Sequence, residues 1–272
     1  EIDSLGNDFV AYHTELIRGV LAGNVFDWGA KQALDVFANE NPGSLQCFRK
    51  TMEKIPPRPW IVDSLDDWLD LVKDPVKRPR NVLIFTDNSG ADVILGILPL
   101  ARAVLSEKWA QGGEAGRVFL VANKEPAIND VTKAELSIIM RKACALDPTL
   151  EKGLNEKRLF LLENGQSSPC LDFRFVSQEL RDVALREKID LMILEGMGRA
   201  IHTNLSAEFS VNCLKIAVIK NRWMAERLGG KLFSVVMKLE KAPLHSIQHN
   251  LEIIHTKDSH RASSAPPQNL DT

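Results

Sequence analysis

The chain has 272 residues, 44% of them hydrophobic, and its 34 basic and 36 acidic side chains leave a formal net charge of −2. Nothing in this near-neutral balance favours nucleic acid or an anionic membrane, so we expect neither as a partner. No apolar run approaches the roughly 18 residues needed to cross a bilayer, and the length suits one large α/β domain with an appendage or two modest domains.

The start of the chain and its four cysteines bear on the compartment. The first residue is Glu1 rather than Met, so we expect a processed product or a piece of a longer protein. No charged-then-apolar leader stands at the start, and the cysteines are far apart, with no C-x-x-C pair and no histidine at ligand spacing. We therefore expect a soluble cytoplasmic protein without a zinc site or a disulfide framework.

Residues 1–75 are expected to form an all-helical subdomain. Apolar residues recur at helical spacing over 9–21 and 26–37, and a further helix is predicted to begin at Asp63 or Ser64, whereas residues 1–72 contain no convincing strand. The polar, proline-rich run 74–80 is the best candidate for a domain boundary. We expect this subdomain to fold over the strand ends of the next domain as a wall or lid.

Residues 76–245 are expected to form an α/β domain, because apolar runs alternate there with helical patterns. The predicted strands are 81–86, 117–122, 158–162, 190–194, 214–219 and 232–238. The predicted helices are 91–108, 131–145, 175–187, 221–228 and a shorter one near 205–211. The fold class is thus a three-layer, Rossmann-like, mostly parallel α/β sheet with an N-terminal helical subdomain. Residues 246–272 lose the apolar period and are expected to form a flexible tail.

Polar side chains follow the predicted strands at the points where these end. They include Asp87-Asn88, Asn123, Glu195 and Lys220. In open α/β sheets the carboxyl ends of the strands form the ligand crevice, so we expect these residues to converge on one site. Polar residues also cap helices at such places for purely structural reasons.

Two acidic turns follow neighbouring strands, and they suggest a cation site. Phosphoaspartate chemistry is not supported after Asp87, because the second carboxylate that it needs two residues later is Ser89, and Asp92 fits better as a helix-dipole residue. Asp130 opens a helix, where an N-cap is the commoner role. If the two turns share a cation, the oxygens of Asp87, Asn88 and Asp130 would suit Mg²⁺ or Mn²⁺.

The run Glu195-Gly196-Met197-Gly198-Arg199 contains paired glycines after a late strand. Ile201 stands where a dinucleotide fingerprint needs a third glycine, so a nicotinamide site is disfavoured. Backbone amides near Gly196 and Gly198 can approach an anion, and Arg199 can grip phosphate with two donors. Lys220 either contributes a third contact to the phosphate or extends from its strand end into solvent.

Several long strings closely resemble the metal-dependent damage-control phosphatases of the ARMT-like, domain-of-unknown-function family. They run from about residue 9 to about 240. Within that family, the chain resembles in particular the phosphatase domain at the C-terminus of a catalytically inactive pantothenate kinase homologue. The strings are LIRGVLAGNVFDWGAK, FTDNSGADVILGILPLAR, NKEPAINDVT, SSPCLDF, LEGMGRAIHTN and IKNRWMAERLGGKLFSVVMK.

The resemblance implies a phosphatase of coenzyme A metabolism. Its substrate would be 4′-phosphopantetheine, particularly oxidised or otherwise damaged forms, and its cofactor a divalent cobalt, nickel, manganese or magnesium ion. The family's metal ligands carry over to Asp87, Asn88 and Asp130. Whether an upstream kinase-like domain belongs to the natural protein stays open, as does a homo-oligomer.

We therefore expect a small phosphate ester to be hydrolysed at the strand ends. The expected catalytic residues are Asp87, Asp130 and Lys220. The expected substrate-binding residues are Asn24, Trp28, Asn123, Glu195, Gly196, Gly198 and Arg199. Asn24 and Trp28 would meet the pantetheine arm, although an aromatic residue at such a turn is slightly more often part of the core. The alternatives are another phosphometabolite such as a sugar phosphate, a nucleotide-cofactor-dependent methyltransferase, and a non-catalytic regulatory module.

Overall fold

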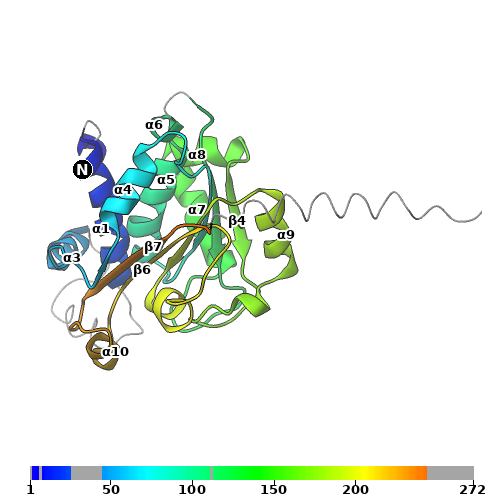
Figure 1. Ribbon diagram of the computed structural model, residues 1–272. Coiled ribbons are helices and arrows are strands. Elements are labelled where there is room, and N and C mark those ends of the chain that lie inside the picture. Colours follow the sequence, from blue (N-terminus) through cyan, green and yellow to red (C-terminus); the bar gives the residue numbers. More distant parts are fainter. Residues whose placement is uncertain (1, 6–7, 26–44, 111–112, 244–272) are drawn as a thin grey trace, which may run out of the picture.

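The structure of the protein is a computed structural model that describes residues 2–5, 8–25, 45–110 and 113–243 (Figure 1). Its strands form one seven-stranded sheet in the order β1-β7-β6-β5-β2-β3-β4. The strands are β1 (Val62–Asp63), β2 (Asn81–Phe85), β3 (Arg117–Ala122), β4 (Leu159–Glu163), β5 (Leu191–Glu195), β6 (Asn212–Val218) and β7 (Val235–Glu240).

The α-helices of the described residues are α1 (Phe9–Val25), α3 (Leu45–Lys54), α4 (Leu65–Lys73), α5 (Leu98–Leu105), α6 (Glu107–Ala110), α7 (Lys133–Cys144), α8 (Pro148–Asn155), α9 (Gln178–Arg186) and α10 (Arg222–Arg227). Two π-helical segments, η2 (Asp92–Ile97) and η4 (Met197–His202), and two 3₁₀ segments, η1 (Ile2–Leu5) and η3 (Phe173–Phe175), complete the regular structure. No helix of this described part is both long and apolar enough to cross a bilayer.

The sheet is parallel from β6 through β4 and antiparallel only where β7 meets β6. Strand β2 is the middle strand of the parallel part β6-β5-β2-β3-β4, with Ile84 opposite Leu120 of β3 and Ile193 of β5. All five strands of the parallel part therefore end at the same edge, as the sequence predicts for βαβ units. The six strands predicted from the apolar runs are all present.

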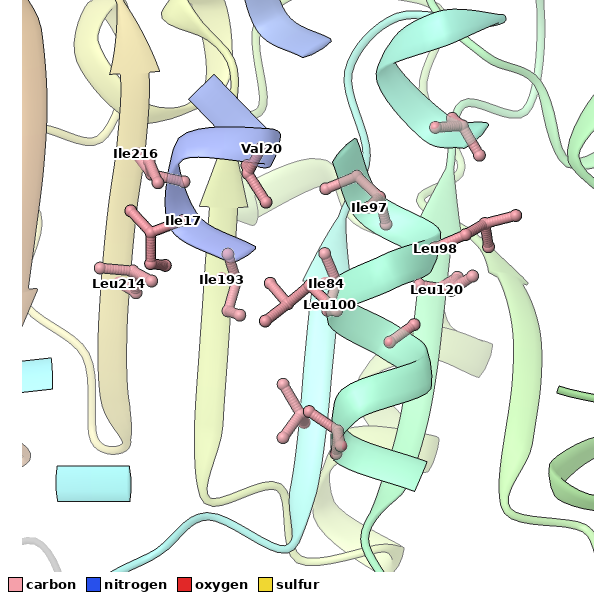
Figure 2. Packing of buried hydrophobic residues seen from close by; sticks show 14 of the residues in the cluster. Ile17, Val20, Ile84, Ile97, Leu98, Leu100, Leu120, Ile193, Leu214 and Ile216 are labelled. Carbon is pink, nitrogen blue, oxygen red and sulfur yellow. The ribbon is translucent and has the colours of Figure 1, made fainter. Parts of the chain in front are cut away.

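Alternate residues of each strand face two separate apolar layers, which makes the fold a three-layer α/β architecture. One layer joins strand residues such as Ile84 and Ile193 to α1, α4, α5, α7 and α8 (Figure 2). The other joins residues such as Phe85 and Leu194 to α9 and α10. Since both faces are covered, the central strands are continuous apolar runs rather than alternating ones.

Helix α1 belongs to the first of these layers and not to a separate core. Its residues Ile17 and Val20 pack over β5 and β6, beside Ile97 of η2 (Figure 2). The N-terminal helix is thus continuous with the core of the sheet, while the predicted boundaries at residues 75 and 245 stay predictions. The predicted helix over 26–37 and the predicted tail over 246–272 lie outside the described residues.

The structure corrects the predicted elements in three places. The short helix expected near 205–211 is absent, and the helical turn lies earlier, at η4. Residues 62–63 form the edge strand β1, although no strand was predicted before residue 72, because a two-residue strand leaves no periodic pattern. Helix α8 was not predicted, although Asp147 followed by Pro148 is a helix-start signal.

Candidate active site

The predicted convergence of polar residues is present at the carboxyl edge of the sheet. Asp87 follows β2, Asn123 follows β3, Glu195 ends β5 and Lys220 follows β6. These four strands are consecutive neighbours in the order β6-β5-β2-β3. All four side chains are buried. The site is therefore a group of enclosed polar side chains and not a row of solvated helix caps.

The two acidic turns pair through their backbones. Asn88 and Asp130 form an isolated antiparallel bridge. The amide of Val131 donates to the Asp87 carbonyl oxygen at 2.9 Å, and the amide of Ser89 donates to the Asn129 carbonyl oxygen at 2.9 Å. The turns are thus fixed relative to each other, with Asp87 and Asp130 side by side.

Asp130 is not the cap of the following helix. The N-cap of α7 is Thr132, whose side chain accepts from the amide of Glu135 while the Glu135 carboxylate accepts from the amide of Thr132. This capping box satisfies the helix start without Asp130. The carboxylate of Asp130 is therefore available to the site. This removes the N-cap role, while the role as a cation ligand stays a prediction.

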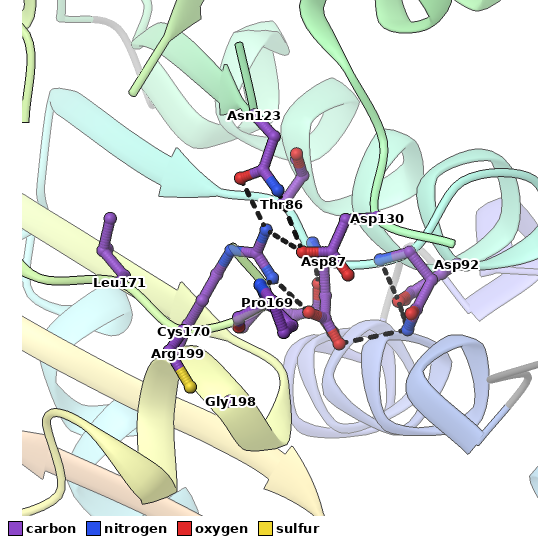
Figure 3. A network of polar contacts seen from close by, with 12 residues as sticks. Thr86, Asp87, Asp92, Asn123, Asp130, Pro169, Cys170, Leu171, Gly198 and Arg199 are labelled. Carbon is purple, nitrogen blue, oxygen red and sulfur yellow. Dashed lines mark hydrogen bonds and ion pairs between the residues drawn. The ribbon is translucent and has the colours of Figure 1, made fainter. Parts of the chain in front are cut away.

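The guanidinium of Arg199 joins the two acidic side chains (Figure 3). Its Nη1 donates to Oδ1 of Asp87, and its Nη2 donates to Oδ2 of Asp130 at 2.7 Å and to Oδ1 of Asn123 at 3.1 Å. The residue is 1% exposed. Burial by itself lowers the pKa of Arg199, but the two carboxylates raise it by more than burial lowers it. The pKa is therefore raised overall, and the guanidinium stays charged. The phosphate contact expected for Arg199 stays a prediction, since its partners here are carboxylates.

Gly196 gives room to Asp87. Its φ is +99°, and a Cβ added there would stand 2.2 Å from Cγ of Asp87. No side chain fits in that space, so glycine is required for close approach. The Gly196 amide, expected to meet a phosphate, donates instead to the carbonyl oxygen of Ile216 at 3.0 Å. Gly198 is also confined, because its added Cβ would lie 2.1 Å from the carbonyl oxygen of Pro169.

Asp92 belongs to the site, which corrects its assignment to the helix dipole. It is 0% exposed, and its Oδ2 accepts from the backbone amide of Asn88 at 3.1 Å and from Nδ2 of Asn88 at 2.9 Å. Burial and the negative charge of Asp87 raise the pKa of Asp92 to about 7. The sequence signal that was missed is a second carboxylate at the start of the helix that follows Asp87.

Glu195 holds the backbone of Asp87. Its Oε2 accepts from the Asp87 amide at 2.8 Å, and its Oε1 accepts from Nδ2 of Asn24 at 2.6 Å. Burial, together with the charges of Asp92 and Asp87, raises the pKa of Glu195 well above its usual value. These contacts make Glu195 a positioning residue, while its predicted contact with substrate stays untested.

Asn24, near the end of α1, connects that helix to the strand ends. Its Nδ2 donates to Oδ2 of Asp87 at 3.1 Å as well as to Glu195, and its Oδ1 accepts from the amide of Val218 at 3.2 Å. Its carbonyl oxygen accepts from Nζ of Lys220 at 2.6 Å. The amide expected to pair with a substrate is therefore used within the protein. Trp28, its predicted companion, lies outside the described residues.

Lys220 points into the protein, not into solvent. It is 2% exposed, and the bond to Asn24 places its ammonium group beside the acidic cluster. Its positive charge acts on Asp92, whose pKa it lowers against the effect of burial. This excludes the alternative in which the lysine extends out of the strand end.

The oxygen-rich surroundings fit a divalent cation. Asp87, Asp92 and Glu195 each offer an oxygen within 4.8 Å of one another, and Oδ1 of Asp92 is buried without a hydrogen-bond partner. The predicted set of Asp87, Asn88 and Asp130 is equally rich in oxygen, and Oδ1 of Asn88 accepts from Nδ2 of Asn129 at 2.7 Å. Carboxylate and amide oxygens suit hard cations. Asp87 is common to both sets.

The chain is similar to several known proteins. The family model of the damage-control phosphatase ARMT1-like domain matches residues 7–236. The chain is 38% identical to mouse 4′-phosphopantetheine phosphatase, over 88% of this chain and 33% of the relative. It is 39% identical to rice pantothenate kinase 2, over 89% of this chain and 28% of the relative.

A third relative is shorter. The chain is 38% identical to a damage-control phosphatase of Arabidopsis thaliana, over 83% of this chain and 57% of the relative. This chain thus spans a third or less of the mouse and rice relatives and somewhat more than half of this one.

Proposed function

This chain belongs to the damage-control phosphatase ARMT1-like domain family, and from that premise we propose that it is a metal-dependent phosphatase acting on 4′-phosphopantetheine and its oxidised or otherwise damaged derivatives. The substrate rests on the 38% identity to a relative named for that activity. Hydrolysis would release inorganic phosphate and the alcohol, pantetheine, and would thereby limit coenzyme A synthesis.

The observation that carries the proposal is the pairing of the two acidic turns. Their backbone bridge brings Asp87, Asn88 and Asp130 together, and the Thr132 cap leaves the Asp130 carboxylate to the site. We assign the metal to these three residues. A divalent cation bound there would supply neutralising charge to phosphate oxygens and a bound water of lowered pKa.

The charge of the site supports the need for a cation. Four carboxylates, those of Asp87, Asp92, Asp130 and Glu195, face two basic groups, Arg199 and Lys220. Fully ionised, this set carries two negative charges in excess and would repel a phosphate dianion. Burial, and after it the negative charges of neighbouring carboxylates, raises the pKa values of Asp92, Asp130 and Glu195. A divalent cation would offset that excess.

The protein's own residues would position the metal ligands and bind the phosphate. Asn24 and Glu195 would hold Asp87, and Asn123 would hold Asp130 through a 3.1 Å bond from its Nδ2. Lys220 would place positive charge against the phosphate, where fixed donors provide most of the catalysis of phosphoryl transfer. We keep Arg199 as a second phosphate contact, next to its role in joining Asp87 to Asp130.

A panel of phosphorylated metabolites tests the proposal. We expect phosphate release from 4′-phosphopantetheine to require one of Co²⁺, Ni²⁺, Mn²⁺ or Mg²⁺ and to stop when a chelator is added. Faster turnover of a sugar phosphate would favour the first alternative. Binding of an adenosine cofactor without phosphate release would favour a methyltransferase, and no turnover of any compound a regulatory module. The cytoplasmic location, the lack of a nucleic-acid partner and the oligomeric state stay predictions.

A further inference from the structure

We infer that a cavity beside the phosphate site receives the alcohol part of the substrate, an inference that rests on the proposed function. The cavity lies between the ends of α1 and α3 and the turn before β7, and its volume is about 370 Å³. This is within the range of small-molecule sites. Its apolar wall consists of Val25, Ile55, Pro56, Leu232 and Phe233.

Two walls of the cavity continue directly into the site. Val25 follows Asn24, whose Nδ2 contacts Oδ2 of Asp87 at 3.1 Å. On the other side, the amide of Phe233 donates at 2.8 Å to the carbonyl oxygen of Ile219, which precedes Lys220. The cavity and the acidic cluster therefore share the same two chain segments as their boundary.

The order of the strands sets how long the alcohol must be. Asp87 follows β2, and the cavity lies where β6 turns into β7, which is two to three strands away along β2-β5-β6-β7. At about 4.8 Å between neighbouring strands, that separation is about 10–14 Å. An aryl phosphate or a sugar phosphate bound at Asp87 is shorter than that, so it would not reach the far wall of the cavity at Leu232 and Phe233.

A pantetheine arm would reach it. The arm has about twelve bonds between its ester oxygen and its sulfur, and at the 3.3–3.6 Å per three bonds of an extended backbone it spans about 13 Å. Its methyl and methylene groups suit the apolar wall. Among the described residues, the lining also includes Lys54 and Lys231 and no acidic side chain, so this part of the cavity suits a neutral or anionic arm better than a cationic one.

Phe233 carries a second mark of a ligand contact. Its φ is +66°, in the left-handed region that a bulky side chain rarely adopts. Glycine adopts this backbone conformation without steric strain. Strain of this kind is concentrated at binding sites, where the side chain is needed in one place. The backbone is held there by the bond from the Phe233 amide and by one from the Ile219 amide to the carbonyl oxygen of Ser234 at 2.9 Å.

The test is Phe233→Gly, which removes the wall while it relieves the backbone. We expect the KM for 4′-phosphopantetheine to rise about tenfold or more, as loss of one buried aromatic surface implies. The kcat/KM for p-nitrophenyl phosphate should stay close to that of the unaltered chain. The melting temperature should fall only slightly, because Phe233 is half-buried and packs against the first core layer, while the relieved backbone offsets part of that loss. Phe175→Ala is the matched control, because Phe175 is 67% exposed and does not line the cavity.

Binding of pantetheine, measured by calorimetry in the presence of Mn²⁺, separates this inference from the proposed function. If the unaltered chain binds pantetheine and Phe233→Gly does not, the cavity is assigned even in the absence of phosphatase activity. Equal losses with both phosphate esters, or a large fall in melting temperature, would make Phe233 structural and overturn the inference. An unchanged KM for 4′-phosphopantetheine, or no pantetheine binding by the unaltered chain, would also overturn it.

Discussion

At the scale of single residues, one guanidinium decides how the acidic turns are held. Arg199 is buried between Asp87 and Asp130 and bonds to both. Without it, two neighbouring carboxylates would face each other in a poorly solvated place. The arginine therefore stabilises the metal-free arrangement, and it also puts a positive charge where a cation is proposed to bind.

We expect Arg199→Met to have opposite effects on metal-free stability and on cation affinity. Removing one partner of a buried ion pair costs about 3–5 kcal/mol, so the melting temperature without metal should fall. Loss of the positive charge should strengthen Mn²⁺ binding and enlarge the rise in melting temperature that the ion produces. Arg174→Met is the control, since its pair with Asp172 is exposed. An unaltered metal-free melting temperature would show that the buried ion pairs of Arg199 do not contribute to the stability of the folded protein.

The choice between the two sets of metal ligands is also made by single residues. Asp130→Asn should abolish both Mn²⁺ binding and phosphate release, as should Asp87→Ala, because each removes a charged ligand of the proposed set. Asp92→Asn keeps an oxygen that can accept from the two N–H donors of Asn88. It should weaken Mn²⁺ binding by about 10–100-fold at most, as expected for a residue that orients a metal ligand without touching the metal. Calorimetric titration of folded variants measures this. If Asp92→Asn abolishes binding and Asp130→Asn does not, the ligands are Asp87, Asp92 and Glu195.

At the scale of secondary-structure elements, the crossing of α1 over η2 brings Asn24 to the site. Glycines make the crossing close. A Cβ added at Gly23 would lie 2.9 Å from Oδ1 and 3.0 Å from Cα of Asp92, whereas one added at Gly19 would lie 3.6 Å from the carbonyl oxygen of Leu95. The first position has no room for a methyl group, and the second offers an ordinary contact.

These two glycines are a matched pair for mutation. Gly23→Ala should push α1 away from η2, displace Asn24 from Asp87, and lower both the melting temperature and kcat/KM. Gly19→Ala should raise stability by about 0.5–1 kcal/mol, because alanine is the better helix former. Thermal melting and turnover of 4′-phosphopantetheine give the comparison. Similar behaviour of the two variants would mean that α1 is free to shift.

At the scale of the whole molecule, α1 and the sheet share one core, so a buried group in α1 affects global stability. His13 is 6% exposed, packs against the rings of Phe9, Tyr12 and Trp109, and has no partner for Nδ1. Burial, aided by the positive charge of Arg78, lowers the pKa of His13 to about 4. The folded protein therefore keeps this imidazole neutral at pH values where an unfolded chain protonates it.

The sign of the pH effect follows from that difference. Between pH 6.5 and 4 the unfolded state binds a proton at His13 that the folded state does not, so stability falls as the pH is lowered. At about 1.4 kcal/mol for each pH unit between the two pKa values, the loss approaches about 3 kcal/mol. Denaturant unfolding of the chain and of His13→Leu, both in chelator, should diverge over this range. A constant difference between them would contradict the prediction.

Much of the fold and part of the site are predictable from the sequence. The apolar runs that became β2, β3 and β5 are local patterns, since a strand covered on both faces must be apolar throughout. The polar residues after them had to meet, because parallel neighbouring strands end at the same edge. The family resemblance, confirmed by the family match, rests on long strings of residues and needs no coordinates.

The partners within the site were decided by the tertiary structure alone. That Asp92 supports Asn88, that Arg199 joins Asp87 to Asp130, and that Asn24 is used inside the protein each depend on where distant segments cross. Asn24 lies 171 positions from Glu195, and no local pattern encodes that contact. Periodicity shows which side chains are buried. Only the packing of α1, η2 and η4 on the strand ends determines which buried polar atoms face one another.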